Sequence, residues 1–179
     1  MLYLALGFIG SSSAVFAALY GIGAVWGQHL PATARLWAAV AILAACALAD
    51  LAMLATGRVY SIGWSRQTPR RAVYQLGDRA GALIWGLDTG LVVTTFRISA
   101  ATWAALGLAL LNVAPAWTGV AYGLGFVLPL AVSVLRPPGR TETVTDPAWL
   151  PGILMRYRRV VQWAGVALIL GGVALPFAQ

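Results

Sequence analysis

Long apolar stretches follow one another through this chain, and few charged residues interrupt them. The stretches are Leu2–Trp26, Leu36–Thr56, Ala80–Asn112, Ala116–Leu135 and Val160–Phe177. A helix that crosses the hydrocarbon core of a bilayer needs roughly 20 residues, and four of the stretches fit one crossing. The third is too long for one straight helix and short for two crossings and a turn. The pattern predicts an all-α integral membrane protein, a single transmembrane domain over residues 1–179. We expect about five transmembrane helices, the third long and broken, with six spans as the alternative.

The composition excludes most other classes of protein. Hydrophobic residues make up 60% of the 179 residues and charged residues 9%, against a usual charged share of about 25%. Too few polar groups remain to cover the surface of a water-soluble enzyme. The net charge of +7 comes from arginine, since all 12 basic residues are Arg. These arginines lie mainly between the apolar stretches rather than over one face, so we expect no nucleic-acid partner.

The arginines are concentrated in two connecting segments. These are Gly57–Arg79, with Arg58, Arg66, Arg70, Arg71 and Arg79, and Arg136–Arg159, with Arg136, Arg140, Arg156, Arg158 and Arg159. Among the connections on the other side, only Arg35 carries positive charge. Five spans put both rich segments on one face, which the positive-inside rule places in the cytoplasm, together with the N-terminus. Six spans would put the two segments on opposite faces, so the charge distribution favours five.

Both arginine-rich segments also contain proline, and we expect them to be structured or semi-extended loops. Their guanidinium groups suit anionic lipid headgroups, at about 1 kcal/mol each. The alternative is that these guanidinium groups bind an acidic surface on a protein partner. No basic residue precedes the first apolar stretch, so we expect it to be kept as a span rather than cleaved as a signal peptide.

Three ionisable side chains fall inside the apolar stretches: Asp50, Asp88 and Arg97. A charge inside a membrane costs several kcal/mol unless it is paired or reaches the interface, so each is a candidate functional residue. The two acids lie at similar predicted depths. Arg58 and Arg79, at the adjoining loop ends, could reach them by snorkelling, which is the simpler interpretation.

Arg97 is harder to place near an interface, because it falls past the midplane of a straight third helix. Nine residues of ideal helix would put it about 180° from Asp88, so the two can pair only if the helix breaks between them. Gly90, Thr94 and Thr95 offer places for a break. Backbone groups freed by a break must line a cavity or be buried in protein. The sequence therefore predicts that any site lies around Asp88, Thr94, Thr95 and Arg97.

The segment Tyr122–Leu130, Tyr-Gly-Leu-Gly-Phe-Val-Leu-Pro-Leu, resembles the Y-x-L-G-L-G-L-P-F signature of CcdA-type membrane proteins. These are compact relatives of the DsbD transmembrane domain, within a LysE-like superfamily, and they pass reducing equivalents across the membrane. In that family the signature follows a broken helix with a Gly-rich W-T-P-C motif, and Gly90–Arg97 stands at the corresponding place here. The resemblance adds Tyr122 and Pro129 to the candidate functional residues. It implies a bacterial inner (plasma) membrane location.

The chain departs from the family at its redox residues. The family's first helix, with its S-P-C motif, has no counterpart here, and no cysteine stands at either reactive position. Cys46, the one cysteine, matches neither motif and suits a small buried residue. Thiol–disulfide exchange requires an attacking thiolate and a resolving thiol, so the resemblance does not carry this chemistry. We find no catalytic constellation, metal-ligand spacing or cofactor motif, and we predict that the protein is not an enzyme.

Three functional hypotheses follow. The first is a non-catalytic, CcdA-like membrane subunit or scaffold, with other membrane proteins as partners. The second is a small-solute or ion transporter that uses the broken third helix. The third is electron transfer across the membrane that relies on the cysteines of a partner.

Overall fold

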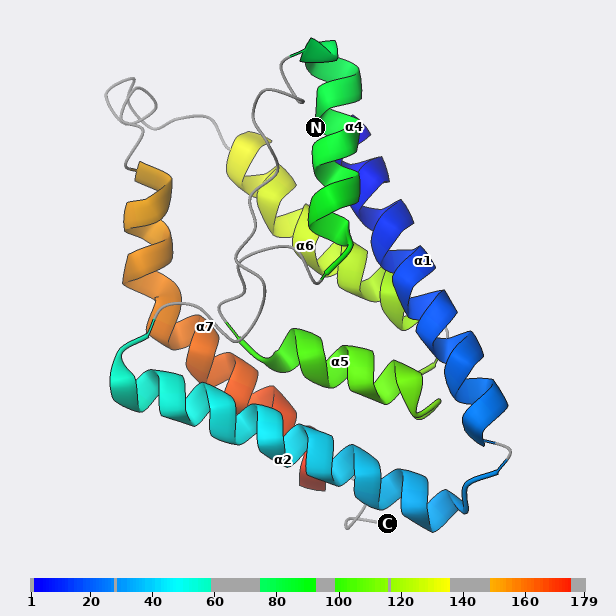
Figure 1. Ribbon diagram of the computed structural model, residues 1–179. Coiled ribbons are helices and arrows are strands. Elements are labelled where there is room, and N and C mark those ends of the chain that lie inside the picture. Colours follow the sequence, from blue (N-terminus) through cyan, green and yellow to red (C-terminus); the bar gives the residue numbers. More distant parts are fainter. Residues whose placement is uncertain are drawn as a thin grey trace.

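The protein folds as a set of six described helices (Figure 1). The computed structural model describes residues 2–27, 29–58, 75–92, 99–115, 117–135 and 149–174. The helices are α1 (Leu2–Gly27), α2 (Ala32–Thr56), α4 (Gly77–Gly90), α5 (Ala101–Leu110), α6 (Thr118–Leu135) and α7 (Trp149–Ala174). Within these ranges there is no β-strand, so the all-α prediction is confirmed for the part of the chain that the structure describes.

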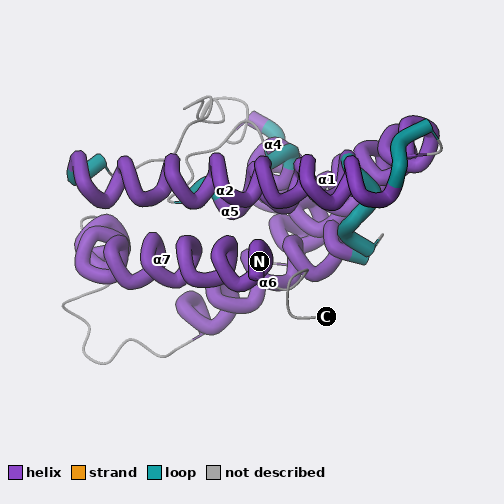
Figure 2. Tube along the Cα trace, turned by 90° about the horizontal axis from the view of Figure 1, so that it is seen from below, coloured by secondary structure: helices purple, strands orange, loops and turns teal. Residues whose placement is uncertain are grey.

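The helices form two groups that share one short helix. In the first group α1 packs against both α4 and α6, and in the second α2 packs against α7. Figure 2 shows α2 and α7 running side by side. The ten-residue helix α5 lies between the groups and contacts α1, α2 and α7. The position of α5 therefore determines how the two groups fit together.

Two helices of the described chain, α1 and α2, are long and apolar enough to cross a membrane. Only 33% of the most apolar window of α1 and 28% of that of α2 is buried inside the molecule. The core helix of a soluble protein would be mostly buried. Several large apolar side chains of these two helices are exposed instead, among them Leu6, Trp26 and Leu48.

The third apolar stretch is interrupted, as predicted. Its first part is α4, which ends at Gly90, and α5 begins only at Ala101. Directly after α4, Val92 adopts a left-handed backbone conformation with φ of 69°. A β-branched residue rarely adopts a positive φ, and this conformation cannot continue a right-handed helix.

The C-terminal end of α2 is closed by glycine. Gly57 adopts φ of 67°, and its N–H and that of Arg58 donate to the carbonyls of Leu54 and Met53 at 3.4 and 3.1 Å. This is a Schellman motif, in which a left-handed residue lets the chain turn back on the last carbonyls. The second apolar stretch therefore ends, as a helix, at Thr56.

The prediction for the second arginine-rich segment was partly wrong. Its last part, from Trp149, is the beginning of α7 and not a semi-extended loop. Pro151 is compatible with this helix because it stands in the first turn, where a backbone N–H has no intrahelical acceptor. The first segment likewise ends inside α4, which begins at Gly77.

Glycines allow α1 and α4 to approach closely. A Cβ atom added at Gly7 of α1 would meet the carbonyl oxygen of Leu83 and lie 2.8 Å from the backbone nitrogen of Leu87. A Cβ atom added at Gly86 of α4 would meet the carbonyl oxygen of Leu4. Neither space can hold a side chain unless a backbone moves, so both positions require glycine for this packing.

Polar side chains are buried in this fold while many large apolar side chains are exposed. Ser11, Ser12, Asp50 and Gln162 are all buried. By contrast, 75% of Leu168 and 66% of Leu48 remain exposed. Buried polar side chains need hydrogen-bond partners inside the fold, so Ser12, Asp50 and Gln162 show where the helices are held together by polar contacts.

Candidate functional site

Of the charged side chains that the structure describes, Asp50 is the most completely buried. It lies on the face of α2 that faces the rest of the molecule and is 0% exposed. The other buried residues of that helix share its face at helical spacing: Ala39, Leu43, Ala47 and Met53. Because these neighbours are small or apolar, the carboxylate needs hydrogen-bond donors from other helices.

The donors come from the start of α5. The backbone N–H of Ala100 donates to Oδ1 of Asp50 at 2.7 Å, and the hydroxyl of Ser99 donates to Oδ2 at 2.6 Å. The Ser99 oxygen in turn accepts the backbone N–H of Ala101 at 3.1 Å. The first N–H groups of a helix have no partner within it. Asp50 and Ser99 supply these partners, so a side chain of α2 caps the N-terminus of α5.

Helix α7 closes the site from its other side. Its buried residues Gln162, Gly165, Val166 and Ile169 recur at helical spacing, as expected for one packed face. A Cβ atom added at Gly165 would meet Oγ of Ser99 and lie 3.5 Å from Oδ2 of Asp50. The absence of a side chain there lets α7 lie directly against the capped end of α5.

Gln162 ties α7 to the end of α2. Its Nε2 donates to the backbone carbonyl of Arg58 at 3.2 Å. We call Asp50, Ser99, Ala100, Gln162 and Gly165 the Asp50 cluster. It joins three helices, α2, α5 and α7, through groups drawn from chain segments far apart in the sequence.

The carboxylate of Asp50 lies at the N-terminal end of α5, where a negative charge is favourable. A helix N-terminus carries partial positive charge, and a nearby carboxylate is stabilising there, more so when it is partly or fully buried. Both carboxylate oxygens accept a hydrogen bond from the end of α5. The hydrogen bonds of the cluster therefore hold the start of α5, the second part of the interrupted third stretch, against α2.

The cluster contains no set of metal ligands. Among the described residues, no group of three or more His, Cys, Asp or Glu side chains could hold a metal ion. Cys46 is a free, half-buried cysteine one turn before Asp50, next to the apolar cluster of Leu43, Ala47, Ala104 and Ile169. It was predicted to be a small buried residue; it packs against this cluster but is only half-buried.

Tyr122 lies at a second junction, between α6, α1 and α5. Its ring stacks on that of Phe8 at 6.1 Å between centroids and lies 5.5 Å from that of Phe16. Its hydroxyl lies 3.5 Å from Oγ1 of Thr102 near the start of α5. Ser12 strengthens the same interface, since its hydroxyl donates to the carbonyl of Gly119 at 3.3 Å. Tyr122 therefore packs helices together rather than facing an open site.

For the other predicted site residues, the structure describes no contact with the Asp50 cluster. Asp88 is half-buried in α4, and its carbonyl accepts the N–H of Leu91 beyond the end of the helix. Pro129 falls within α6, where it lacks the N–H that would bond to the carbonyl of Gly125. Thr94, Thr95 and Arg97 lie outside the described residues.

The expected pairing of acids with loop arginines is not the arrangement found at Asp50. Its described partners are Ser99 and Ala100, while Arg58 contributes its backbone carbonyl to Gln162. The Arg79 guanidinium lies 6.0 Å from the centre of the Tyr3 ring. A backbone donor and a short hydroxyl hydrogen bond satisfy a buried carboxylate without the cost of burying a second charge.

Sequence reasoning missed Ser99, Gln162 and Gly165. One signal was available for Gln162, which is a polar residue inside an apolar stretch and shares a helical face with Gly165 and Ile169. Ser99 could have been recognised as a residue type that caps helices, directly before an apolar helical segment.

Comparison of the chain with family models, with curated proteins and with solved structures gave no match. The resemblance of Tyr122–Leu130 to the CcdA-type signature therefore stays a prediction, carried by the motif itself.

Proposed function

We propose that this protein is a multi-pass membrane protein that serves as a non-catalytic subunit or scaffold of a larger membrane complex. The observation that carries the proposal is the combination of buried polar side chains with large apolar side chains that stay exposed on the same helices. Asp50 and Gln162 are bound to other helices in the interior, while Leu48 and Leu168 on the same two helices point outward. Outward apolar side chains suit lipid or the apolar surface of other membrane helices.

We propose five crossings for the full chain. Helices α1, α2, α6 and α7 account for four, and the interrupted pair α4 and α5 accounts for the third in chain order. The first arginine-rich segment, which ends in the first turn of α4, and the second, whose last part forms the start of α7, then face the cytoplasm together with the N-terminus. This arrangement fits the inner membrane of a bacterium, in keeping with the CcdA-like signature within α6.

The use made of the polar groups supports a structural role. Both oxygens of Asp50 and the amide of Gln162 hold α5 and α7 against α2. The hydroxyl of Ser12 holds α6 against α1. Polar groups whose hydrogen bonds are already made within the fold suit helix assembly better than catalysis. This supports a CcdA-like scaffold that lacks the family's cysteines.

A transporter is the second candidate, and the interruption of the third stretch favours it. Substrate sites in small transporters are commonly built at broken helices, with a helix terminus facing the bound group. Here the N-terminus of α5 faces the carboxylate of Asp50. A third possibility, electron transfer with the cysteines of a partner, would depend on Cys46 or on thiols that this chain does not contain.

Purification from the native membrane in a mild detergent tests the proposal. A subunit should co-purify in fixed stoichiometry with one or more other membrane proteins, and Asp50→Asn, which keeps an oxygen acceptor for Ala100, should preserve that complex. Recovery of the chain only as a homo-oligomer, with solute or ion flux in vesicles that Asp50→Asn abolishes, would favour the transporter instead.

A further inference from the structure

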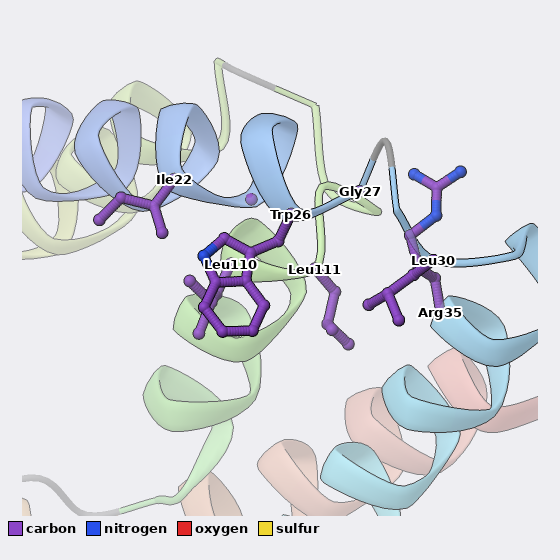
Figure 3. A pocket seen from close by; sticks show the side chains of 8 residues that line it. Ile22, Trp26, Gly27, Leu30, Arg35, Leu110 and Leu111 are labelled. Atoms are coloured by element: carbon purple, nitrogen blue, oxygen red, sulfur yellow. The ribbon is translucent and has the colours of Figure 1, made fainter.

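An apolar hollow lies where the end of α1 meets the start of α2 and the end of α5. It has a volume of about 240 Å³. Figure 3 shows the side chains that line it: Ile22 and Trp26 belong to α1, and Leu110 and Leu111 lie at the end of α5. The remaining lining residues are Gly23, Gly27, Leu30 and Arg35. Apart from Arg35, the lining contains no charged residue.

Arg35 gives the hollow one cationic group. Its Nε is buried and makes no hydrogen bond to any described residue. Its Nη1 would lie 3.3 Å from a Cβ atom added at Gly27, so the missing side chain of that glycine leaves room for the guanidinium. In Figure 3 the guanidinium extends away from the apolar side chains, at the edge of the hollow. Such a group binds phosphate well, because its donors are fixed in one plane.

A second hollow adjoins the first. It has a volume of about 410 Å³ and is lined by Val25, Trp26, His29 and Leu30. Trp26 and Leu30 line both hollows, so the two spaces are adjacent. Two neighbouring apolar spaces with a cation at the edge of one of them match a ligand that has two hydrocarbon chains and an anionic headgroup.

We propose that this end of the protein binds an anionic phospholipid, with its phosphate on Arg35 and its acyl chains in the two hollows. The inference rests on the proposed membrane location but not on the subunit role. It also differs from headgroup contacts of the arginine-rich segments, because in the five-span topology Arg35 lies on the opposite face of the membrane. The apolar lining requires acyl chains, which free phosphate lacks.

Native mass spectrometry of the delipidated protein tests this assignment. The protein is offered phosphatidylglycerol or phosphatidylcholine in mild detergent, and the bound lipids are counted. We expect one phosphatidylglycerol per chain that resists competition, and Arg35→Gln should weaken its binding roughly tenfold, as the loss of one charge-assisted hydrogen bond would. Arg79→Gln is the matched control: this exposed arginine of α4 belongs to an arginine-rich segment that offers only weak headgroup contacts, so its replacement should leave the one competition-resistant phosphatidylglycerol in place.

A second variant keeps the charge and removes the space. Ile22→Trp should fill the hollow and weaken phosphatidylglycerol binding while Arg35 is intact. If Arg35→Gln does not fold, this variant alone tests whether the lipid binds in the hollow. Equal retention of both lipids, or no effect of either variant, would overturn the proposal.

Displacement of the lipid by inorganic phosphate alone would show a simple anion site, and a dimer that persists without lipid would show that a second copy fills the hollow. A chain that binds lipid selectively yet purifies without partners would contradict the subunit role and leave this site intact.

Discussion

The carboxylate of Asp50 and the hydroxyl of Ser99 lie 2.6 Å apart, although 49 positions separate the two residues in the chain. With the N–H of Ala100, they join α2 to the start of α5. Because α5 contacts both helix groups, the Asp50–Ser99 hydrogen bond helps to fix how the two groups pack together.

Replacing Asp50 by Ala should destabilise the protein by roughly 1–3 kcal/mol, because the N–H of Ala100 would lose its partner in the interior. Asp50→Asn should cost less, since it keeps an oxygen acceptor. Thermal unfolding in detergent, followed by tryptophan fluorescence, measures both. Asp78→Ala is the control: Asp78 is exposed in the first turn of α4, and its loss should cost under about 1 kcal/mol. Equal decreases in unfolding temperature for Asp50→Ala and Asp78→Ala would show that the hydrogen bonds of Asp50 do not stabilise the fold.

Two glycines of α1 should respond in opposite ways to the same change. Gly7→Ala should lower the unfolding temperature, because the added methyl meets the backbone of α4 at Leu83 and Leu87. Gly10→Ala should be neutral or stabilising by up to about 1 kcal/mol, because the methyl meets nothing within 4 Å and alanine favours helix. Tolerance of both changes would contradict the close packing of α1 on α4.

Cys46→Ala should leave assembly and function nearly unchanged. The thiol is half-buried beside small and aliphatic neighbours, and the chain holds no second cysteine with which it could pair. Complex yield after purification, compared between the variant and the original chain, is the measurement. Loss of function in a variant that still folds would instead support electron transfer through a partner's thiol.

The five-span topology predicts that both arginine-rich segments face the cytoplasm. Single cysteines at Ser65 and Thr143, introduced with Cys46 replaced, should be protected from a membrane-impermeant reagent added outside intact cells and should react after lysis. Labelling of one position but not the other in intact cells would place the segments on opposite faces and exclude five spans.

The sequence predicted the helices well where apolar runs were unbroken, as in α1 and α2, and the interruption after Gly90 was also foreseen. It missed the early start of α7, because the arginines before Val160 suggested a loop although arginine is a good helix former. Asp50 was recognised by its charge in an apolar stretch. Its partners were not, because Ser99 and Ala100 reach it only through the tertiary arrangement of α2 and α5.

The most direct test of the central claim is whether the outward apolar side chains face lipid. Spin labels at Leu6 of α1, Leu48 of α2 and Leu168 of α7, all exposed positions, are introduced in the Cys46→Ala background and reconstituted in vesicles. The account predicts that all three collide more often with oxygen, which partitions into lipid, than with a water-soluble nickel complex. A label at the exposed Arg58, in the first arginine-rich segment, should show the reverse. Collision mainly with the nickel complex at Leu48 and Leu168 would contradict a multi-pass membrane protein.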